Sequence, residues 1–205
     1  NMFIADGHHR FEVACGYRDE LSEKLGDAYT GEEDFNYILT YFTNTDSRGL
    51  TIFPIHRLLK LAENFDTNAF IKSLSEYFDV EDIKDKNRFF FLMDKGGRTE
   101  HVLGIYRDQT YWLLRLKNVK ILDKLISDKP KEYRSLDVSI LNYLIFKNIL
   151  KVAPDDTSAI LYTHDIDEAQ KLVDDKQFSI AFFLNPVRME QIMAVALRGE
   201  KMPPK

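Results

Sequence analysis

The chain has 205 residues and a net charge of −5, with 44% hydrophobic and 30% charged residues. This length suits one large globular domain or two small ones, and the composition excludes a disordered chain. The acidic balance argues against an overall basic surface for nucleic acids. No apolar run reaches the ~18 residues of a membrane span, and the single cysteine, Cys15, excludes an internal disulfide framework. We therefore expect a soluble, cytoplasmic protein with Cys15 buried as a small hydrophobic residue.

The first part of the chain predicts three strands and two helices. Short apolar or β-rich runs between turn residues are typical of strands, whereas apolar residues three to four apart indicate amphipathic helices. In chain order, the expected elements are a strand at 2–5, a helix at 8–25, strands at 37–45 and 49–54, and a helix at 67–78. Gly26 is expected to end the first helix, and Pro54 to end the third strand, before a turn or short helix.

The rest of the chain predicts an antiparallel meander followed by alternating strands and helices. Three aromatic-rich runs separated by turn residues predict the meander strands at 87–94, 101–108 and 110–117. The elements expected after them are helices near 118–127 and 136–151, a strand at 158–165, a helix at 165–175, a strand at 178–186 and a helix at 187–200. This order indicates an α+β (mixed α/β) fold. We expect residues 1–205 to form one unit, with a weakly signalled boundary near 65 or 118. We also expect the chain to be a fragment of a longer protein.

The residues with the clearest chemistry lie where the first expected strand meets the first helix: Asp6, Gly7, His8, His9 and Arg10. The first N–H groups of a helix lack internal partners and lie at the positive end of the dipole, so such a corner can bind an anion. Gly7 lets a phosphate approach the backbone, Arg10 adds a forked, permanently charged donor, and His8 and His9 add further donors. Asp6 can hold a divalent metal or act as a base. All of these residues suit a nucleotide phosphate.

A purely structural role accounts for the same residues. Asp6 can cap the helix, and His8 and His9 can satisfy nearby backbone groups. Adjacent histidines point about 100° apart on a helix, so the pair is not expected to bind one metal. The spacing of a zinc site, the Walker pattern and the dinucleotide glycine fingerprint are all absent, and we expect neither zinc nor haem.

Further polar residues occur at the ends of later strands, where they can either line a site or serve the fold. These candidate site-lining residues are His56, Arg57, Tyr162, His164, Asp165 and Asn185. His56 and Arg57 would add a second cationic contact to the same cleft. We expect His101 to lie at the surface or to pack against neighbouring side chains. Asp137 or Ser135 is expected to cap the helix at 136–151.

The stretch IADGHHRFEVACGYRDE at residues 4–20 resembles the signature of an uncharacterised prokaryotic family, domain of unknown function 1015. Further matches follow in the family's order and extend the resemblance over essentially the whole chain: FPIHR (53–57), DVSIL (137–141), YTHDIDEA (162–169), FFLNP (182–186) and LRGEKMPPK (197–205). The corner also resembles the phosphate-binding motif of the ParB/sulfiredoxin superfamily. That group includes an ADP-dependent free-serine kinase with a similar Asp-Gly-His-His-Arg, the partition proteins that hydrolyse CTP, and sulfiredoxin.

The resemblance implies that His8, His9 and Arg10 contact nucleotide phosphates, with Asp6 near the metal or the acceptor. Sulfiredoxin needs a cysteine where this chain has His8, and the basic helix-turn-helix of the partition proteins is absent, so a kinase-like function fits best. We expect a nucleotide-dependent phosphotransferase or nucleotide hydrolase that acts on a small hydroxylated metabolite, with Mg²⁺, ADP or ATP, and Asp6 and His8 as catalytic residues. The kinase's catalytic glutamate lies upstream of its motif, so no catalytic base is placed here. The alternative is a non-catalytic module that senses a nucleotide or another anion.

Overall fold

The structure is a computed structural model that describes residues 2–4, 6–45, 47, 49–62, 64–154 and 158–203. The chain divides into two compact units, Asn1–Thr51 and Ile52–Lys205. Positions 65 and 118 both lie inside the second unit. In the described part of the chain, no helix has the length and apolar character needed to cross a membrane.

The first unit contains α1 (His8–Leu25) and two single turns of 3₁₀ helix, η1 (Gly26–Ala28) and η2 (Asp34–Asn36). Helix α1 confirms the predicted helix, but it buries none of its residues, and Cys15 is half-buried rather than buried. The strands predicted at 2–5 and 37–45 are wrong, because the described residues of both segments form no strand; Ala5 lies outside the described residues. A β-rich run becomes a strand only when a neighbouring strand pairs with it.

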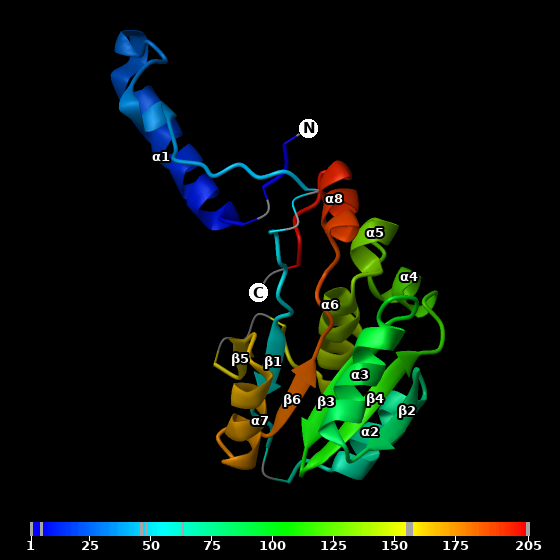
Figure 1. Cartoon of the computed structure of the whole chain (residues 1–205). Coiled ribbons are helices and arrows are strands. Elements are labelled where there is room, and N and C mark those ends of the chain that lie inside the picture. Colours follow the sequence, from blue (N-terminus) through cyan, green and yellow to red (C-terminus); the bar gives the residue numbers. More distant parts are fainter. Residues whose placement is uncertain are drawn as a thin grey trace. The chain divides into compact units, whose positions relative to one another are not determined.

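The second unit is built around a six-stranded, fully antiparallel sheet in the order β2-β4-β3-β6-β1-β5 (Figure 1). The strands are β1 (His56–Leu59), β2 (Phe78–Ile83), β3 (Val102–Arg107), β4 (Thr110–Leu116), β5 (Ile160–Thr163) and β6 (Ile180–Phe183). Since all neighbours run antiparallel, β1 and β3 begin at the same end of the sheet where β5 and β6 stop. We call this the His56 end, because His56 is the first residue of β1.

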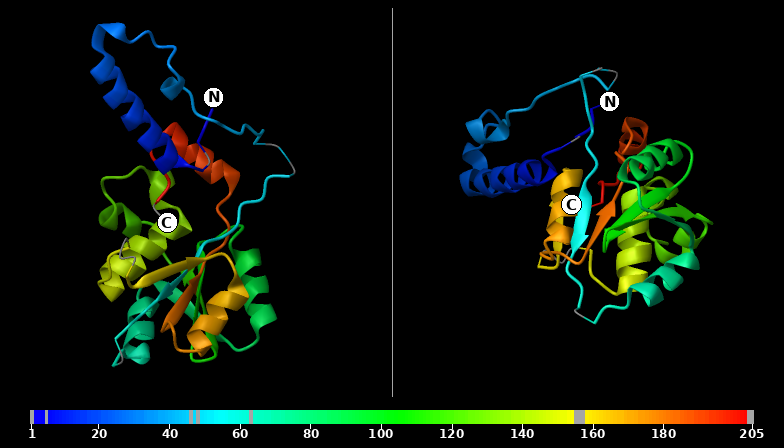
Figure 2. Two further views of the ribbon diagram at one scale, coloured as in Figure 1. Left: turned by 90° about the vertical axis from the view of Figure 1, so that its left-hand side faces the viewer. Right: turned by 60° about the horizontal axis from the view of Figure 1, so that its bottom comes forward.

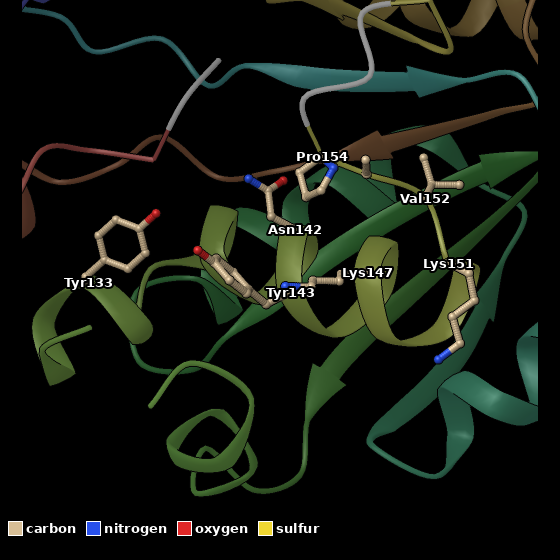
Figure 3. A pocket seen from close by; sticks show the side chains of 8 residues that line it. Tyr133, Asn142, Tyr143, Lys147, Lys151, Val152 and Pro154 are labelled. Carbon is tan, nitrogen blue, oxygen red and sulfur yellow. The ribbon is translucent and has the colours of Figure 1, made fainter. Parts of the chain in front are cut away.

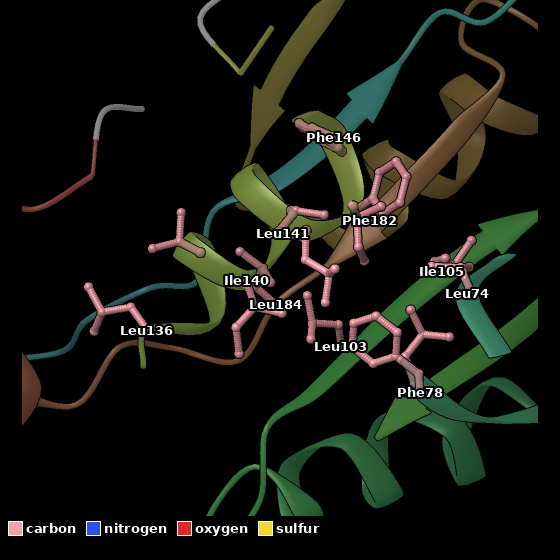
Figure 4. Close-up of a cluster of buried hydrophobic side chains, with 14 of the residues drawn as sticks. Leu74, Phe78, Leu103, Ile105, Leu136, Ile140, Leu141, Phe146, Phe182 and Leu184 are labelled. Atoms are coloured by element: carbon pink, nitrogen blue, oxygen red, sulfur yellow. The ribbon is translucent and has the colours of Figure 1, made fainter. Parts of the chain in front are cut away.

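Helices cover both faces of the sheet (Figures 1 and 2). The helices on one face are α3 (Lys86–Gly96) and α7 (Ile166–Asp174), and those on the other are α2 (Thr67–Ser75), α4 (Ile121–Leu125), α5 (Lys131–Arg134), α6 (Asp137–Ser139), η3 (Ile140–Leu150) and α8 (Met189–Leu197). The alternation of β3 separates the two cores: Leu103 and Ile105 join the larger cluster, while Val102 and Tyr106 join the smaller one. Figure 4 shows the larger cluster, in which η3, a π-helix, packs on the sheet. The prediction of a mixed α/β fold is confirmed.

Three element predictions need correction in this unit. The run at 87–94 is not a strand, because it lies in α3. The strand predicted at 49–54 lies instead beyond Pro54, where β1 starts at His56. The helix expected at 67–78 ends at Ser75, and the strand that follows it, β2, was not predicted.

The later elements agree better with the sequence. Strands β3, β4, β5 and β6 and helices α7 and α8 all confirm predicted elements, and α4 lies within the helix expected near 118–127. The helix expected at 136–151 is formed by α6 and η3 together. Its N-cap is Leu136, so neither Asp137 nor Ser135 has the predicted capping role.

Candidate functional site

Helix α1 begins at a glycine in the left-handed conformation. Gly7 is the N-cap with φ +81° and ψ 20°, a geometry that glycine adopts at little cost. The N-cap residue is a glycine and so has no side chain to cap this helix, and the first turn holds no acidic residue. By contrast, the carboxylates of Asp66, Asp85 and Asp165 cap α2, α3 and α7 by accepting backbone N–H groups. The N-cap position of α1 therefore lacks the carboxylate that three other helices have at theirs.

The first turn of α1 carries basic side chains instead. His8 is half-buried, whereas His9 and Arg10 are exposed. The Arg10 guanidinium folds back over Gly7, because a Cβ placed on that glycine would lie 3.3 Å from Arg10 Nη2. A cation at the positive end of a helix dipole is unfavourable unless an anion lies beside it. Of the predicted corner residues, Arg10 and Gly7 thus lie against each other, whereas His9 Nδ1 lies 3.8 Å from the Glu12 carboxylate.

Asp6 lies directly before this turn and is exposed. Within the described ranges, no group of three or more His, Cys, Asp or Glu side chains is placed to hold a metal ion. Magnesium does not need such a cage, because it commonly uses one or two carboxylates together with phosphate oxygens and waters. The exposed carboxylate of Asp6 is of the type that this mode of binding uses.

His56 and Arg57 lie in the second unit, inside β1 rather than at the end of an earlier strand. They pair with Thr163 and Tyr162 of β5, and both are buried, with 2% and 4% exposure. His56 Nδ1 accepts a hydrogen bond from the Leu184 N–H at 3.3 Å, while its Nε2 is buried without a partner. Burial, and then repulsion from Arg57, lowers the pKa of His56 to about 4. The ring is therefore neutral at pH 7.

Tyr162 and His164 flank the same end of the sheet. The Tyr162 hydroxyl donates to the Pro154 carbonyl at 3.1 Å, and the Arg57 guanidinium lies 5.7 Å from the centre of the Tyr162 ring. The exposed His164 ring lies 6.0 Å from the ring of Phe53. The structure thus brings His56, Arg57, Tyr162 and His164 together around the start of β1.

Asp165 and Asn185 have structural contacts in this fold. The Asp165 carboxylate accepts the N–H groups of Asp167 and Glu168 at 2.8 and 3.0 Å, which lowers its pKa. The Asn185 amide donates to the carbonyls of Met93 at 3.2 Å and Val102 at 3.4 Å. These bonds cap α7 and tie the segment after β6 to α3 and β3.

Two cavities open within the second unit. The larger, of about 550 Å³, lies beside η3 and is lined by Tyr133, Asn142, Tyr143, Lys147 and Lys151, among others (Figure 3). None of the residues predicted from the sequence lines it. The smaller cavity, of about 150 Å³, lies at the His56 end and includes Asn185.

The smaller cavity also contains a histidine–aspartate pair that sequence reasoning missed. His101 Nδ1 lies 2.9 Å from Asp137 Oδ1, and both side chains are partly buried. The two residues are 36 positions apart, so no local pattern joins them. The available signal was that Asp137 opens the DVSIL stretch and that His101 is the first residue of a predicted strand.

Several solved structures resemble this chain at low sequence identity. Among solved structures, a conserved hypothetical protein from Pyrococcus furiosus is 16% identical with a TM-score of 0.46, and the match covers 98% of this chain and 67% of that one. A free serine kinase in complex with AMP is 18% identical with a TM-score of 0.43, covering 98% of this chain and 64% of the kinase. A mutant free serine kinase in complex with ADP is 19% identical with a TM-score of 0.45, at 98% and 64% coverage.

This chain therefore spans about two thirds of the length of these structures. No curated protein matches the chain significantly. The model of the family "Protein of unknown function (DUF1015)" matches residues 1–139. The chain belongs to this family of proteins of unknown function.

Proposed function

We propose that the corner formed by Asp6, Gly7, His8, His9 and Arg10 binds the phosphates of a nucleotide, and that the whole protein transfers a phosphoryl group to a small hydroxylated metabolite or to water. One observation carries this proposal: α1 starts at a left-handed glycine, has no side-chain cap and no acidic first-turn residue, and holds Arg10 over its N-terminus. A phosphate would accept hydrogen bonds from the N–H groups of the first turn and offset the positive charge.

Each corner residue has a distinct role in this proposal. The N–H groups of the first turn and the Arg10 guanidinium hold phosphate oxygens, and His8 and His9 donate further hydrogen bonds. Asp6 would hold Mg²⁺, which supplies charge neutralisation on the phosphates. Phosphoryl transfer depends mostly on positioning and charge neutralisation, and these residues provide both. Asp6 and the half-buried His8 are the groups available to move a proton at the corner.

The motif supports an adenosine nucleotide, because it resembles that of an ADP-dependent kinase more than those of sulfiredoxin or the partition proteins. The same geometry would also serve a module that senses a nucleotide without consuming it. These two functions share the binding site and differ only in turnover, so binding and turnover need separate experiments.

Isothermal titration of the full-length protein with ATP, ADP, CTP and GTP in Mg²⁺ tests the binding site. The Arg10→Ala change removes a charge-assisted hydrogen bond to phosphate, which is worth about 1.5–3 kcal/mol, so we expect the dissociation constant to rise about 10- to 100-fold. Arg18→Ala is the matched control, because Arg18 lies on the same helix, is exposed and pairs with Asp19 at 2.6 Å. Unchanged affinity in Arg10→Ala would overturn the proposed site.

Phosphorus NMR of the bound nucleotide in the presence of hydroxylated amino acids and sugars then tests turnover. A new phosphate ester, or release of inorganic phosphate, supports the transferase or hydrolase. Binding with no consumption by the full-length protein supports the sensing module instead.

A further inference from the structure

Arg57 is buried, and none of the carboxylates that the structure describes pairs with it. Its side chain is 4% exposed, in a strand paired with β5 on one side and β6 on the other. Most other described arginines pair with a carboxylate, Arg107 and Arg134 among them, and Arg10 and Arg188 are exposed. Within the part of the chain that the structure describes, Arg57 is therefore the buried arginine whose charge no carboxylate neutralises.

The hydrogen bonds of Arg57 use one edge of its guanidinium and leave the other open. Nη1 donates to the Ile55 carbonyl, and the guanidinium carbon, Cζ, lies over the Tyr162 ring. Nε is buried without a partner, and no hydrogen bond joins Nη2 to the described residues. The N–H groups of Nε and Nη2 lie on the same edge and point the same way, which is the fork that binds a carboxylate or phosphate through two bonds.

The charge on this side chain persists at neutral pH. Burial lowers the pKa of Arg57 to about 10, which still leaves it protonated at pH 7. A buried charge without a counter-ion is strongly destabilising unless a partner of opposite sign approaches it. A bound anion would therefore neutralise the charge of Arg57 and stabilise the folded protein.

Among residues 52–62, 64–154 and 158–203, the side chains near Arg57 at the His56 end do not supply that anion. His56 is neutral at pH 7 because of its low pKa, and His164 carries no negative charge. The Asp165 carboxylate is used by the N–H groups at the start of α7 and forms no ion pair with Arg57. The Tyr162 hydroxyl donates its proton to the Pro154 carbonyl.

We propose that the Nε–Nη2 edge of Arg57 binds an oxyanion, the carboxylate or phosphate group of a small ligand, at the His56 end of the sheet. This site lies wholly in the second unit. It does not depend on the nucleotide site proposed at the corner, and either one can fail without the other.

Thermal unfolding of the whole chain in chloride buffer tests the site, with inorganic phosphate or acetate added at constant ionic strength. All comparisons are made in an Arg10→Ala background, so that anion binding at the corner does not contribute. Arg57→Met keeps the apolar stem and removes the charge, while Arg57→Lys keeps the charge and removes the fork. Arg107→Met is the matched control, because Arg107 also lies over a ring, that of Phe65 at 5.4 Å, but pairs with Asp108 at 3.1 Å.

At anion concentrations about tenfold above the dissociation constant, the midpoint of the background protein is expected to rise by about 2–5 °C, and Arg107→Met to rise equally. Arg57→Met is expected to show no rise, and in chloride to be at least as stable as the background, because an apolar side chain replaces an unpaired buried charge. Arg57→Lys is expected to need at least tenfold more anion. A response to phosphate alone identifies a phosphate group, and one to acetate identifies a carboxylate.

Two results would overturn the proposal. One is an equal rise in Arg57→Met and the background protein, which would place the anion elsewhere. The other is the absence of a rise with either anion in a background protein that unfolds cooperatively.

Discussion

His56 and Arg57 are consecutive residues of one strand, so their side chains point to opposite faces of the sheet. The alternation of β1 places His56 on the face of Leu58, which packs in the cluster beneath α3 and α7, and Arg57 on the face of Leu59. The His56 ring packs edge-on against Phe183 with ring centres 5.0 Å apart. The first two residues of β1 thus place a neutral imidazole on one face of the sheet and a charged guanidinium on the other.

The low pKa of His56 predicts a loss of stability in mild acid. The unfolded chain takes up a proton on this residue near pH 6.5, whereas the folded protein does so only near pH 4. The contribution is therefore complete above pH 6.5 and is lost as the pH falls from 6.5 to 4, by up to about 3 kcal/mol. Urea unfolding of the wild type and His56→Gln at pH 7 and pH 4.5 measures it, and the variant is expected to lose less stability.

The exposed His9 provides the control for this experiment. His9→Gln is expected to show the pH dependence of the wild type. An equal loss of stability in the wild type and in His56→Gln would mean that burial of His56 does not resist protonation.

At this scale, the sequence predicts which residues carry chemistry better than it predicts their partners. The corner residues Gly7 and Arg10 are local to one helix start, so their arrangement follows from chain order. The isolation of Arg57 depends on which carboxylates the fold brings near it, and the His101–Asp137 pair joins residues 36 positions apart. Neither feature has a local signature.

Helix α3 shows how a sequence pattern misleads at the scale of one element. Three consecutive phenylalanines favour a strand by propensity alone. In the structure, the Asp85 carboxylate accepts the Arg88 N–H and begins a helix. Phe89 and Met93 are then one turn apart and buried, while Phe91 is 64% exposed. The helical period, not the propensity, decides which aromatic side chains reach the core.

The contact of α3 with the sheet predicts a sensitive glycine. A Cβ at Gly104 of β3 would lie 2.4 Å from the Phe89 ring and 2.7 Å from the Met93 sulfur. Overpacking of this kind costs about 1–3 kcal/mol, so Gly104→Ala is expected to lower the free energy of unfolding by that amount in urea. Gly16→Ala, in α1, is the control, because nothing lies within 4 Å of its added methyl group.

A fall in stability of the same size in Gly16→Ala, or none in Gly104→Ala, would contradict direct packing of α3 on β3. A compensating second substitution, Phe89→Leu in the Gly104→Ala background, is expected to recover part of the lost stability, because it removes the ring edge that the new methyl group meets.

For the whole molecule, the two hydrophobic clusters belong to the second unit. Every buried residue in them lies between Leu58 and Val195, whereas α1 buries none of its residues. We therefore expect residues 52–205 alone to unfold in one cooperative thermal transition within a few degrees of the intact chain. Circular dichroism of both proteins measures this, and a non-cooperative transition for residues 52–205 would mean that the first unit stabilises the sheet.

The sequence predicts the class of the fold and the alternation of strands and helices after β3, because those strands are continuous apolar runs between clear turns. It does not predict the sheet order, in which β1 lies between β5 and β6, because pairing over about 100 residues leaves no local trace. The position of Arg57 in a central strand follows from that order.

The nucleotide site at the start of α1 is the central claim, and backbone NMR of the isotope-labelled protein tests it most directly. Adding ADP with Mg²⁺ is expected to shift the amide resonances of Gly7, His8, His9 and Arg10 far more than those at the other end of the helix, around Leu25. At an ADP concentration near the wild-type dissociation constant, the shifts are expected to be about tenfold smaller or less in Arg10→Ala, because its affinity is expected to be about 10- to 100-fold lower. Unchanged resonances at residues 7–10 with saturating ADP or ATP, or shifts confined to the second unit, would contradict it.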